Sequence, residues 1–171
     1  MWQSADGISL EQGKYGVEIL KRFGMMDCKN MTTPMASKLK LLSDASSKSI
    51  DSMMYHQMIG SLMYLRNTRP DICFAVNTLS QFLTDPRHVH LIAAKHILRY
   101  LRGTIDYGLK YEASQKINLE GYVDSDWDGS AIDRKSTLGC CFSVGSSVIS
   151  WFSRKKSCMV LSTDERGSLK L

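Results

Sequence analysis

The feature that most constrains the fold is a change in the spacing of apolar residues at Gly103. Before Gly103 the apolar residues recur every three or four positions, which is the period of an amphipathic helix. After it they alternate with polar residues in short runs separated by glycine and serine, as in strands joined by turns. The chain is therefore predicted to be α+β, with a helical part followed by an antiparallel sheet.

Capping residues, glycine and proline divide the helical part. Asp51 is a good N-cap for a helix over residues 51–66, and Pro70 suits the first turn of a helix that the Asp85-Pro86 pair ends. Further helices are predicted over residues 11–23 and 88–102. Residues 27–49 are rich in serine, threonine and lysine, and we expect an extended connection there.

The second part contains four predicted strands and the start of one more helix. The strands cover residues 107–111, 117–127, 139–144 and 148–153, and Ser162-Thr163-Asp164-Glu165 has the pattern of a capped helix start. The change of period places a domain boundary between residues 111 and 112. We therefore predict a helical domain over residues 1–111 and a stranded domain over residues 112–171.

Charge and cysteine content narrow the possible partners. The 171 residues carry a net charge of +5, which favours acidic partners such as nucleic acid. Five cysteines, with no Cys-x-x-Cys pair, favour free thiols over a zinc site or a disulfide framework. No secretion signal and no apolar run of transmembrane length is present in the sequence, so no membrane insertion is expected.

The densest acidic cluster contains Asp124, Asp126 and Asp128, which alternation places on one face of a strand. Clustered carboxylates are the ligands that Mg²⁺ requires, although a polar strand end leading into a turn has the same pattern. The spacing also matches the start of an EF-hand calcium loop. That match fails at the twelfth position, where Lys135 replaces the bidentate glutamate.

Cations accumulate between residues 87 and 110, with aromatic residues among them. This arrangement fits a nucleic-acid groove, but also the solvated outer face of an ordinary helix. The residues are Arg87, Lys95, Arg99, Arg102 and Lys110, with Tyr100 and Tyr107. The histidines His56, His88, His90 and His96 lack a metal-binding spacing, so structural or surface roles are expected for them.

Several motifs, taken together and in order, resemble the copia-type retrotransposon Pol polyproteins. They cover nearly the whole chain, and they include Thr68-Arg69-Pro70-Asp71-Ile72, residues 55–64, residues 94–104, residues 122–127, residues 133–137 and Ile149-Ser150-Trp151. The resemblance implies that the helical part is the C-terminal tail of a reverse transcriptase. It implies that the stranded part is the beginning, truncated here, of a ribonuclease H-like domain, which cuts the RNA of an RNA-DNA hybrid.

The same resemblance implies a two-metal site, of which Asp124 is the first Mg²⁺ ligand. In the family's next motif a second glutamate binds metal, but Arg166 stands at that position, and Glu165 beside it points about 100° away on a helix. A cation cannot bind Mg²⁺. We therefore expect a catalytically inactive, intracellular remnant, with Asp124 as a vestigial ligand.

Truncation of the sheet carries an expectation about stability. Strands without a covering helix leave an apolar face that needs water or a partner. We expect marginal stability in the stranded part.

A second interpretation comes from two short patterns. Arg99-Tyr100-Leu101-Arg102 and Asp164-Glu165-Arg166 resemble the RxLR and dEER elements of oomycete effectors. That family implies secretion, delivery into the cytoplasm or nucleus of a host plant cell, and binding to a host plant protein that changes defence or cell death. The RxLR-like pattern lies within a predicted helix, far from the N-terminus where such motifs normally occur.

Overall fold

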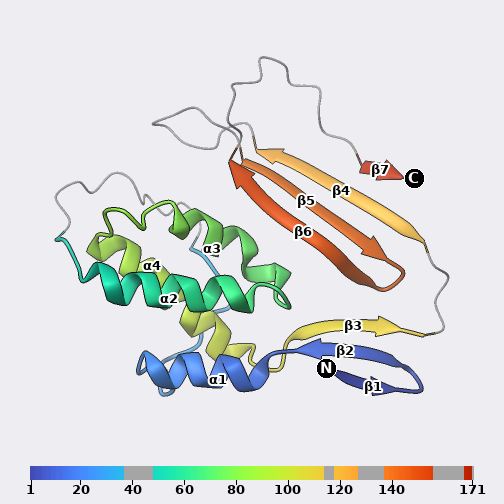
Figure 1. Ribbon diagram of the computed structural model, residues 1–171, viewed down its shortest axis with the longest axis horizontal. Helices are drawn as coiled ribbons and strands as arrows, with labels where there is room; N and C mark the ends of the chain where they lie inside the picture. Colours follow the sequence, from blue (N-terminus) through green and yellow to red (C-terminus); the bar gives the residue numbers. More distant parts are fainter. Residues whose placement is uncertain (37–47, 114–117, 127–136, 156–167, 171) are drawn as a thin grey trace, which may run out of the picture. The chain divides into compact units, whose positions relative to one another are not determined.

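The computed structural model describes residues 1–36, 48–113, 118–126, 137–155 and 168–170, and it is α+β as predicted (Figure 1). The described chain separates into two compact units. The first, here the helical unit, is Glu11–Gly108, and the second, the strand unit, joins Met1–Leu10 to Leu109–Leu171. The predicted domain boundary between residues 111 and 112 stays a prediction, because compactness does not test independent folding.

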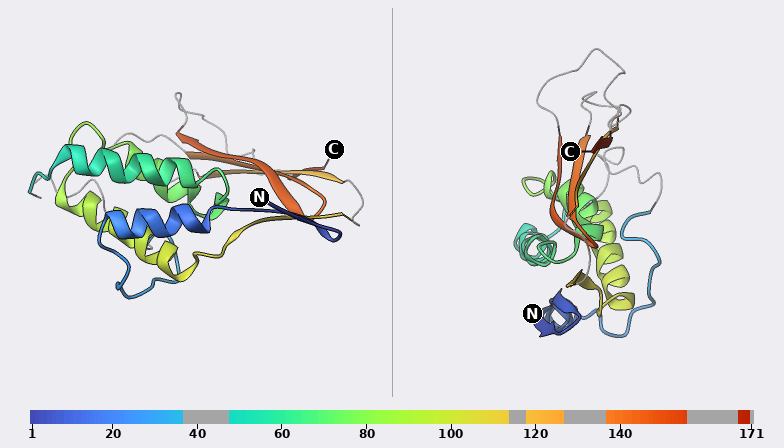
Figure 2. Two further views of the ribbon diagram at one scale, coloured as in Figure 1. Left: turned by 60° about the horizontal axis from the view of Figure 1, so that its bottom comes forward. Right: turned by 90° about the vertical axis from the view of Figure 1, so that its right-hand side faces the viewer.

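The helical unit contains α1 (Gly13–Arg22), α2 (Ser52–Leu65), the 3-10 turn η1 (Pro70–Ile72), α3 (Cys73–Ser80) and α4 (His88–Gly103). The predicted cap at Asp51 is confirmed, since its Oδ1 accepts from the amide of Met53 at 2.9 Å. The helix predicted from Pro70 is instead a 3-10 turn followed by α3. Figure 2 shows α4 beside the other helices, and α1, α2 and α3 all contact it.

The core of the helical unit is closed and almost entirely apolar. Its side chains come from all four of these helices and from η1, and many are fully buried, including Ile19, Leu20, Tyr55, Met58, Ile59, Leu62, Ile72, Leu79, Ile97, Leu98 and Leu101. The one hydroxyl among them is satisfied, because Tyr55 on α2 donates to the carbonyl of Leu79 at 2.9 Å. Burial raises the pKa of Tyr55, so this phenol stays neutral.

The N-terminal residues form a hairpin that the sequence analysis did not predict. Strands β1 (Trp2–Ser4) and β2 (Gly7–Glu11) pair antiparallel, and β3 (Gly108–Glu112) completes a sheet of order β1-β2-β3. Gly7 has a φ of 146°, and a Cβ there would lie 2.0 Å from the carbonyl oxygen of Tyr111. No element was predicted for residues 1–10, whose sheet depends on a strand about a hundred positions away.

The second sheet has the strand order β6-β5-β4-β7. It consists of β4 (Leu119–Asp126), β5 (Thr137–Val144), β6 (Ser147–Lys155) and the short β7 (Ser168–Lys170), all antiparallel to their neighbours. The three strands predicted in this region are confirmed as β4, β5 and β6. Strand β7 was not predicted. The predicted helix start at residues 162–165 lies outside the described residues.

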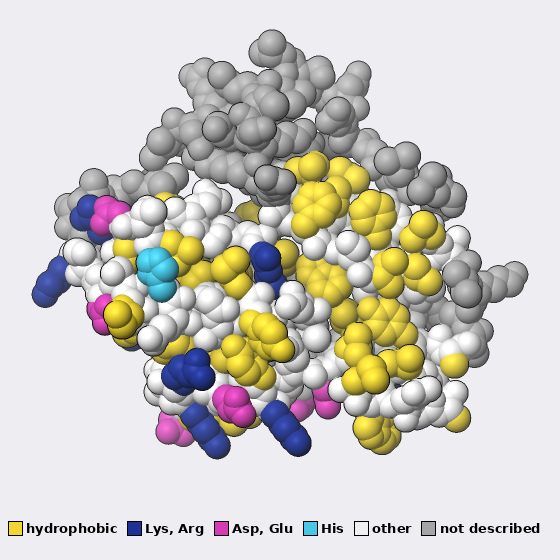
Figure 3. Space-filling model, in the orientation of Figure 1, with side chains coloured by type: hydrophobic (Ala, Val, Ile, Leu, Met, Phe, Trp, Pro, Cys, Tyr) yellow, Lys and Arg dark blue, Asp and Glu magenta, His cyan; other side chains and the backbone are white. Residues whose placement is uncertain are grey.

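Alternation divides this sheet into an apolar and a more polar face. The register places Leu119, Val123, Leu138, Cys140, Phe142, Val144 and Phe152 on one face. Each of these side chains is partly or largely exposed, with Leu119 at 41% and Phe152 at 42%. Figure 3 shows hydrophobic side chains gathered over the strands of this unit. Among its described residues, Leu109 is the only hydrophobic side chain that is buried.

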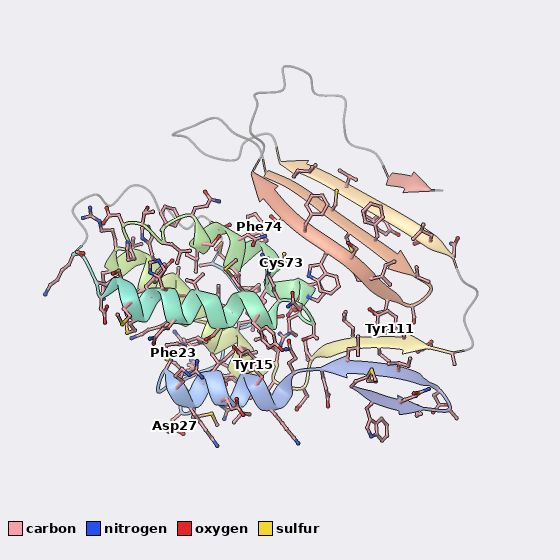
Figure 4. The ribbon with its side chains drawn as sticks, viewed as in Figure 1. Tyr15, Phe23, Asp27, Cys73, Phe74 and Tyr111 are labelled. Atoms are coloured by element: carbon pink, nitrogen blue, oxygen red, sulfur yellow. The ribbon has the colours of Figure 1, made fainter. Side chains whose placement is uncertain are left out.

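Within the strand unit, β3 also contacts β6. The hydroxyl of Tyr111, labelled in Figure 4, donates to the carbonyl of Val148 at 2.7 Å. The amide of Glu112 donates to the hydroxyl of Ser146 at 3.1 Å. These bonds join the two sheets of the unit through polar contacts rather than through an apolar core.

Candidate functional site

Strand β4 carries the acidic residues that the sequence analysis selected. Asp124 lies opposite Gly139 on β5, and Asp126 lies opposite Thr137. Both aspartates lie within β4, on the strand predicted for this region, and Glu120 and Tyr122 share one face of that strand. Asp128 and Lys135, which decide the turn and EF-hand alternatives, lie outside the described residues.

Glu120, two residues before Tyr122 on β4, is engaged by hydrogen bonds from its neighbours. The carboxylate of Glu120 accepts a hydrogen bond from Tyr122 at 2.8 Å and another from Asn118 at 3.1 Å. In the parts of the chain that the structure describes, no three His, Cys, Asp or Glu residues gather as they would around an ion. Asp164, Glu165 and Arg166 lie outside those parts, so the expected ligand set stays a prediction.

The structure brings together a second group of motif residues, in the helical unit. Arg69 is 2% exposed and binds the carboxylate of Asp71 at 2.7 Å. The same guanidinium donates to the carbonyl of Thr104 at 2.8 Å and to its hydroxyl at 2.7 Å. Tyr100 donates to Asp71 at 2.9 Å. This network ties the turn before α3 to the end of α4.

The electrostatics of the network agree with its geometry. Burial alone would raise the pKa of Asp71, but the hydrogen bonds and charge of Arg69, with the Tyr100 hydroxyl, outweigh burial and lower it. Burial and the neighbouring carboxylate raise the pKa of Tyr100. The guanidinium also lies 5.5 Å from the ring centroid of Tyr107. Every charge in the network is thus paired, as a structural site requires.

Thr68-Arg69-Pro70-Asp71 is part of a family motif, but no role was predicted for Arg69 or Asp71. A signal was present, because an arginine two residues before an aspartate across a proline can form a local ion pair. The partner Thr104 is 35 residues away and carries no such signal. The motif is a structural clamp in this chain.

The RxLR-like motif lies in the last turns of α4, and all four of its residues make contacts within the helical unit. Leu101 is 1% exposed and Tyr100 is 8% exposed. The Nε atoms of Arg99 and Arg102 donate to the carbonyls of Lys29 and Met26, both at 2.7 Å. In this fold the motif is part of a packed helix.

Two cations of the predicted basic run have acidic partners. Arg87 pairs with Asp85 at 2.7 Å, and Lys110 on β3 approaches Glu112 at 3.9 Å. Tyr100 is buried, so it does not present its ring to a base. The remaining cations of the predicted groove all lie on α4, and they are Lys95, Arg99 and Arg102.

The histidines have structural surroundings, as expected. His90 is 4% exposed, accepts from the amide of Arg87 through Nδ1 at 3.0 Å, and stacks on Phe82 with ring centroids 4.0 Å apart. His96 contacts the carbonyl of Thr33 through Nε2 at 3.0 Å, and His56 contacts that of Ser52 through Nδ1 at 2.7 Å. Within the described residues, no helix is long and apolar enough to cross a bilayer.

The sequence of this chain is similar to those of several known proteins. It is 42% identical over 159 residues to the retrovirus-related Pol polyprotein from transposon RE1 of Arabidopsis thaliana, a match that covers 93% of this chain and 11% of the polyprotein. It is 38% identical over 159 residues to an uncharacterized mitochondrial protein of the same plant, covering 66% of that protein. It is also 42% identical over 112 residues to secreted RxLR effector protein 161 of Plasmopara viticola, covering 65% of this chain and 79% of the effector.

The chain belongs to the family of retrotransposon Pol polyproteins and the shorter proteins that share their sequence. It corresponds to one segment of such a polyprotein, about a tenth of the RE1 protein in length. The predicted resemblance is confirmed. No family model matches the chain, and no solved structure matches it.

Proposed function

We propose that this chain is a Pol-derived segment in which the end of a reverse transcriptase joins the start of a ribonuclease H-like domain, and that it does not cut RNA. The observation that carries the proposal is the 42% identity to the RE1 Pol polyprotein over 93% of the chain. The order of the elements supports it. Helices α1–α4 precede the four-stranded antiparallel sheet, and Asp124 lies on β4 of that sheet.

The chemistry of the acidic residues supports the inactive state. Two-metal hydrolysis needs several carboxylates converging on ions that activate water and stabilise the leaving oxygen. Asp124 is one candidate ligand, while Glu120 on the same face is engaged by Asn118 and Tyr122. Arg166 stands where the family's motif requires an acid. With a cation at position 166 and Glu120 already hydrogen-bonded, these residues do not fit a pair of Mg²⁺ ions.

A hydrolysis assay tests this proposal. The whole chain is incubated with an RNA-DNA hybrid labelled on its RNA strand, with Mg²⁺, with Mn²⁺ and with chelator. We expect no cleavage above buffer in any arm. Divalent-dependent cleavage that Asp124→Asn abolishes and Glu120→Gln preserves would overturn the inactive assignment, because a contaminating nuclease would not respond to one aspartate of this chain.

We propose that the chain binds nucleic acid without cutting it, inside the cell that carries the retrotransposon. The copia-type family that the chain resembles acts on nucleic acid, and the net charge of +5 supports an RNA-DNA hybrid as partner. We propose an intracellular location on the same ground. Binding without cleavage is the expected outcome of a gel-shift assay with the hybrid.

One observation favours a second candidate function, a secreted effector that acts inside host plant cells by binding. It is the 42% identity to secreted RxLR effector protein 161, of which the chain spans 79%. The contacts of Arg99-Tyr100-Leu101-Arg102 weigh against delivery through this motif, because two of its residues are buried and two are anchored.

Two experiments separate the effector from the element segment. The chain is expressed in plant leaf cells as a fluorescent fusion, and cell death is scored beside Asp124→Asn and an empty control. A response that Asp124→Asn leaves unchanged would support the effector, whereas absence of a response supports the element segment. For delivery, uptake of the Arg99→Ala, Arg102→Ala variant equal to that of the parent chain would exclude a role for the motif.

A further inference from the structure

The backbone of residues 26–33, here the strap, is fastened along α4 by side chains of that helix. Arg102 donates to the carbonyl of Met26, Arg99 to that of Lys29, and His96 contacts that of Thr33 at 3.0 Å. The amide of Met31 returns a bond to the carbonyl of Arg99 at 3.3 Å. Figure 2 shows this segment running alongside α4.

Spacing explains why these side chains act together. Residues 96, 99 and 102 are three apart, so they lie on one face of the helix, with Cβ atoms of neighbours about 5–6 Å apart. Lys95 is four residues before Arg99 and belongs to the same side. Gly103 extends the contact, because a Cβ there would lie 3.1 Å from the Cβ of Asn30.

The anchoring uses only part of each guanidinium. In the described residues, Arg99 and Arg102 form hydrogen bonds through Nε alone, which leaves both Nη groups of each as donors. Neither takes part in an ion pair within those residues. Lys29 and Lys95 add two exposed cations, while the strap contributes one carboxylate, Asp27.

We propose that Arg99 and Arg102, with Lys29 and Lys95, form a phosphate-binding surface for the backbone of nucleic acid. The proposal rests on the binding role proposed above and names its surface. A guanidinium held by its Nε is pre-organised, so less side-chain freedom is lost when the Nη groups meet a phosphate.

The composition of the surface favours nucleic acid over a protein partner. Protein interfaces gather their energy in buried aromatic anchors, but the aromatic residue here, Tyr100, faces the interior and bonds Asp71. The exposed residues of the strap are polar or charged, including Asn30, Thr32 and Thr33. Cations and small polar groups are the donors that contact phosphate and sugar without reading sequence.

The test measures binding of the whole chain to a fluorescein-labelled 20-base-pair DNA duplex, and to the RNA-DNA hybrid of the same sequence, across a series of salt concentrations. The Arg99→Gln, Arg102→Gln variant should bind about tenfold more weakly at low salt. Its slope of log affinity against log salt should fall by about two, one for each lost phosphate contact.

Two further variants separate charge from structure. Lys14→Gln, Lys48→Gln removes the same net charge from exposed positions outside the strap and outside α4, and its slope should remain close to that of the parent chain. Arg99→Lys, Arg102→Lys keeps the charge and loses the guanidinium, so it should retain most of the slope while its strap is less firmly held. Circular dichroism confirms that each variant is folded.

Several outcomes would overturn the surface. The first is no binding of the parent chain to either duplex. The second is an equal loss of affinity in the Arg99→Gln, Arg102→Gln variant and in the Lys14→Gln, Lys48→Gln control. The third is arginine-dependent binding to phosphatidylserine vesicles without binding to the duplexes. Loss of duplex binding by the parent chain would overturn the proposed binding role together with the surface, whereas equal losses in the two glutamine variants would overturn the surface alone. The hydrolysis assay tests the absence of cleavage independently of all three outcomes.

Discussion

The two units of this protein reach their folds by different means. The helical unit encloses a core of fully buried side chains from several helices, whereas the apolar side chains that the structure describes in the four-stranded sheet are half-buried or exposed. Family motifs occur in both units, yet in the helical unit they are engaged in contacts that hold the fold. A family motif can therefore mark packing contacts, as it does in the helical unit, while the metal role of the motif around Asp124 in the strand unit stays a prediction.

The largest expected effect is at the clamp of the helical unit. Arg69→Met should lower the free energy of unfolding by about 3–5 kcal/mol, because it leaves Asp71 partly buried without its cation. Urea unfolding followed by circular dichroism at the helix band measures the change. Arg22→Met, at an exposed position in the last turn of α1, is the matched control and should cost less than about 1 kcal/mol. Equal costs for the two variants would show that the clamp is not structural.

Core truncations compare the units directly. Leu98→Ala, at a fully buried site on α4, should cost about 2–5 kcal/mol through lost burial and a residual cavity. Val123→Ala, at a half-buried site on β4, should change the same transition by less than about 1 kcal/mol. Near-equal losses would mean that the two units unfold together as one cooperative structure.

A smaller effect is expected at the start of α2. The carboxylate of Asp51 caps this helix through the amide of Met53. Asp51→Ala should cost about 1 kcal/mol, and Asp51→Ser, which retains a capping oxygen, should restore most of it. Thermal unfolding of the three proteins measures the difference. If the serine variant is no more stable than the alanine variant, the cap is not the source of the effect.

The smallest effect is a pH dependence confined to acid conditions. The folded state lowers the pKa of Asp71 below its ordinary value of 3.8, so the unfolded chain takes up this proton first as the pH falls. The stability contributed by Asp71 is present above pH 3.8 and is lost as the pH falls through the lower folded pKa. Asp71→Asn should remove this part of the acid dependence, as measured by urea unfolding between pH 3 and 5. An unchanged acid dependence in Asp71→Asn would assign it to other carboxylates.

The elements with a strong local pattern could be predicted from sequence. The amphipathic period located α2 and α4, and alternation placed Asp124 on a strand, which the structure has as β4. The hairpin of β1 and β2 escaped prediction because its strands are short and depend on pairing with the distant β3. Tertiary pairing decides such segments more than their own composition does.

The candidate sites were predicted in part. Arg99 and Arg102 were selected as a motif, but their acceptors on the strap are main-chain carbonyls, which leave no trace in the sequence. The contact of Arg69 with Thr104 is equally non-local. The metal role of Asp124 and the residues near Arg166 stay predictions, since the described geometry does not bear on them.

Native-state hydrogen exchange of the whole chain, read by mass spectrometry, tests the central contrast most directly. We predict that amides of α4 exchange only through global unfolding of the helical unit, whereas amides of β5 exchange through an opening of lower free energy. That difference would confirm a stable helical unit beside a marginal sheet. Protection of β5 equal to that of α4, together with a single thermal transition that includes the strand signal, would contradict it.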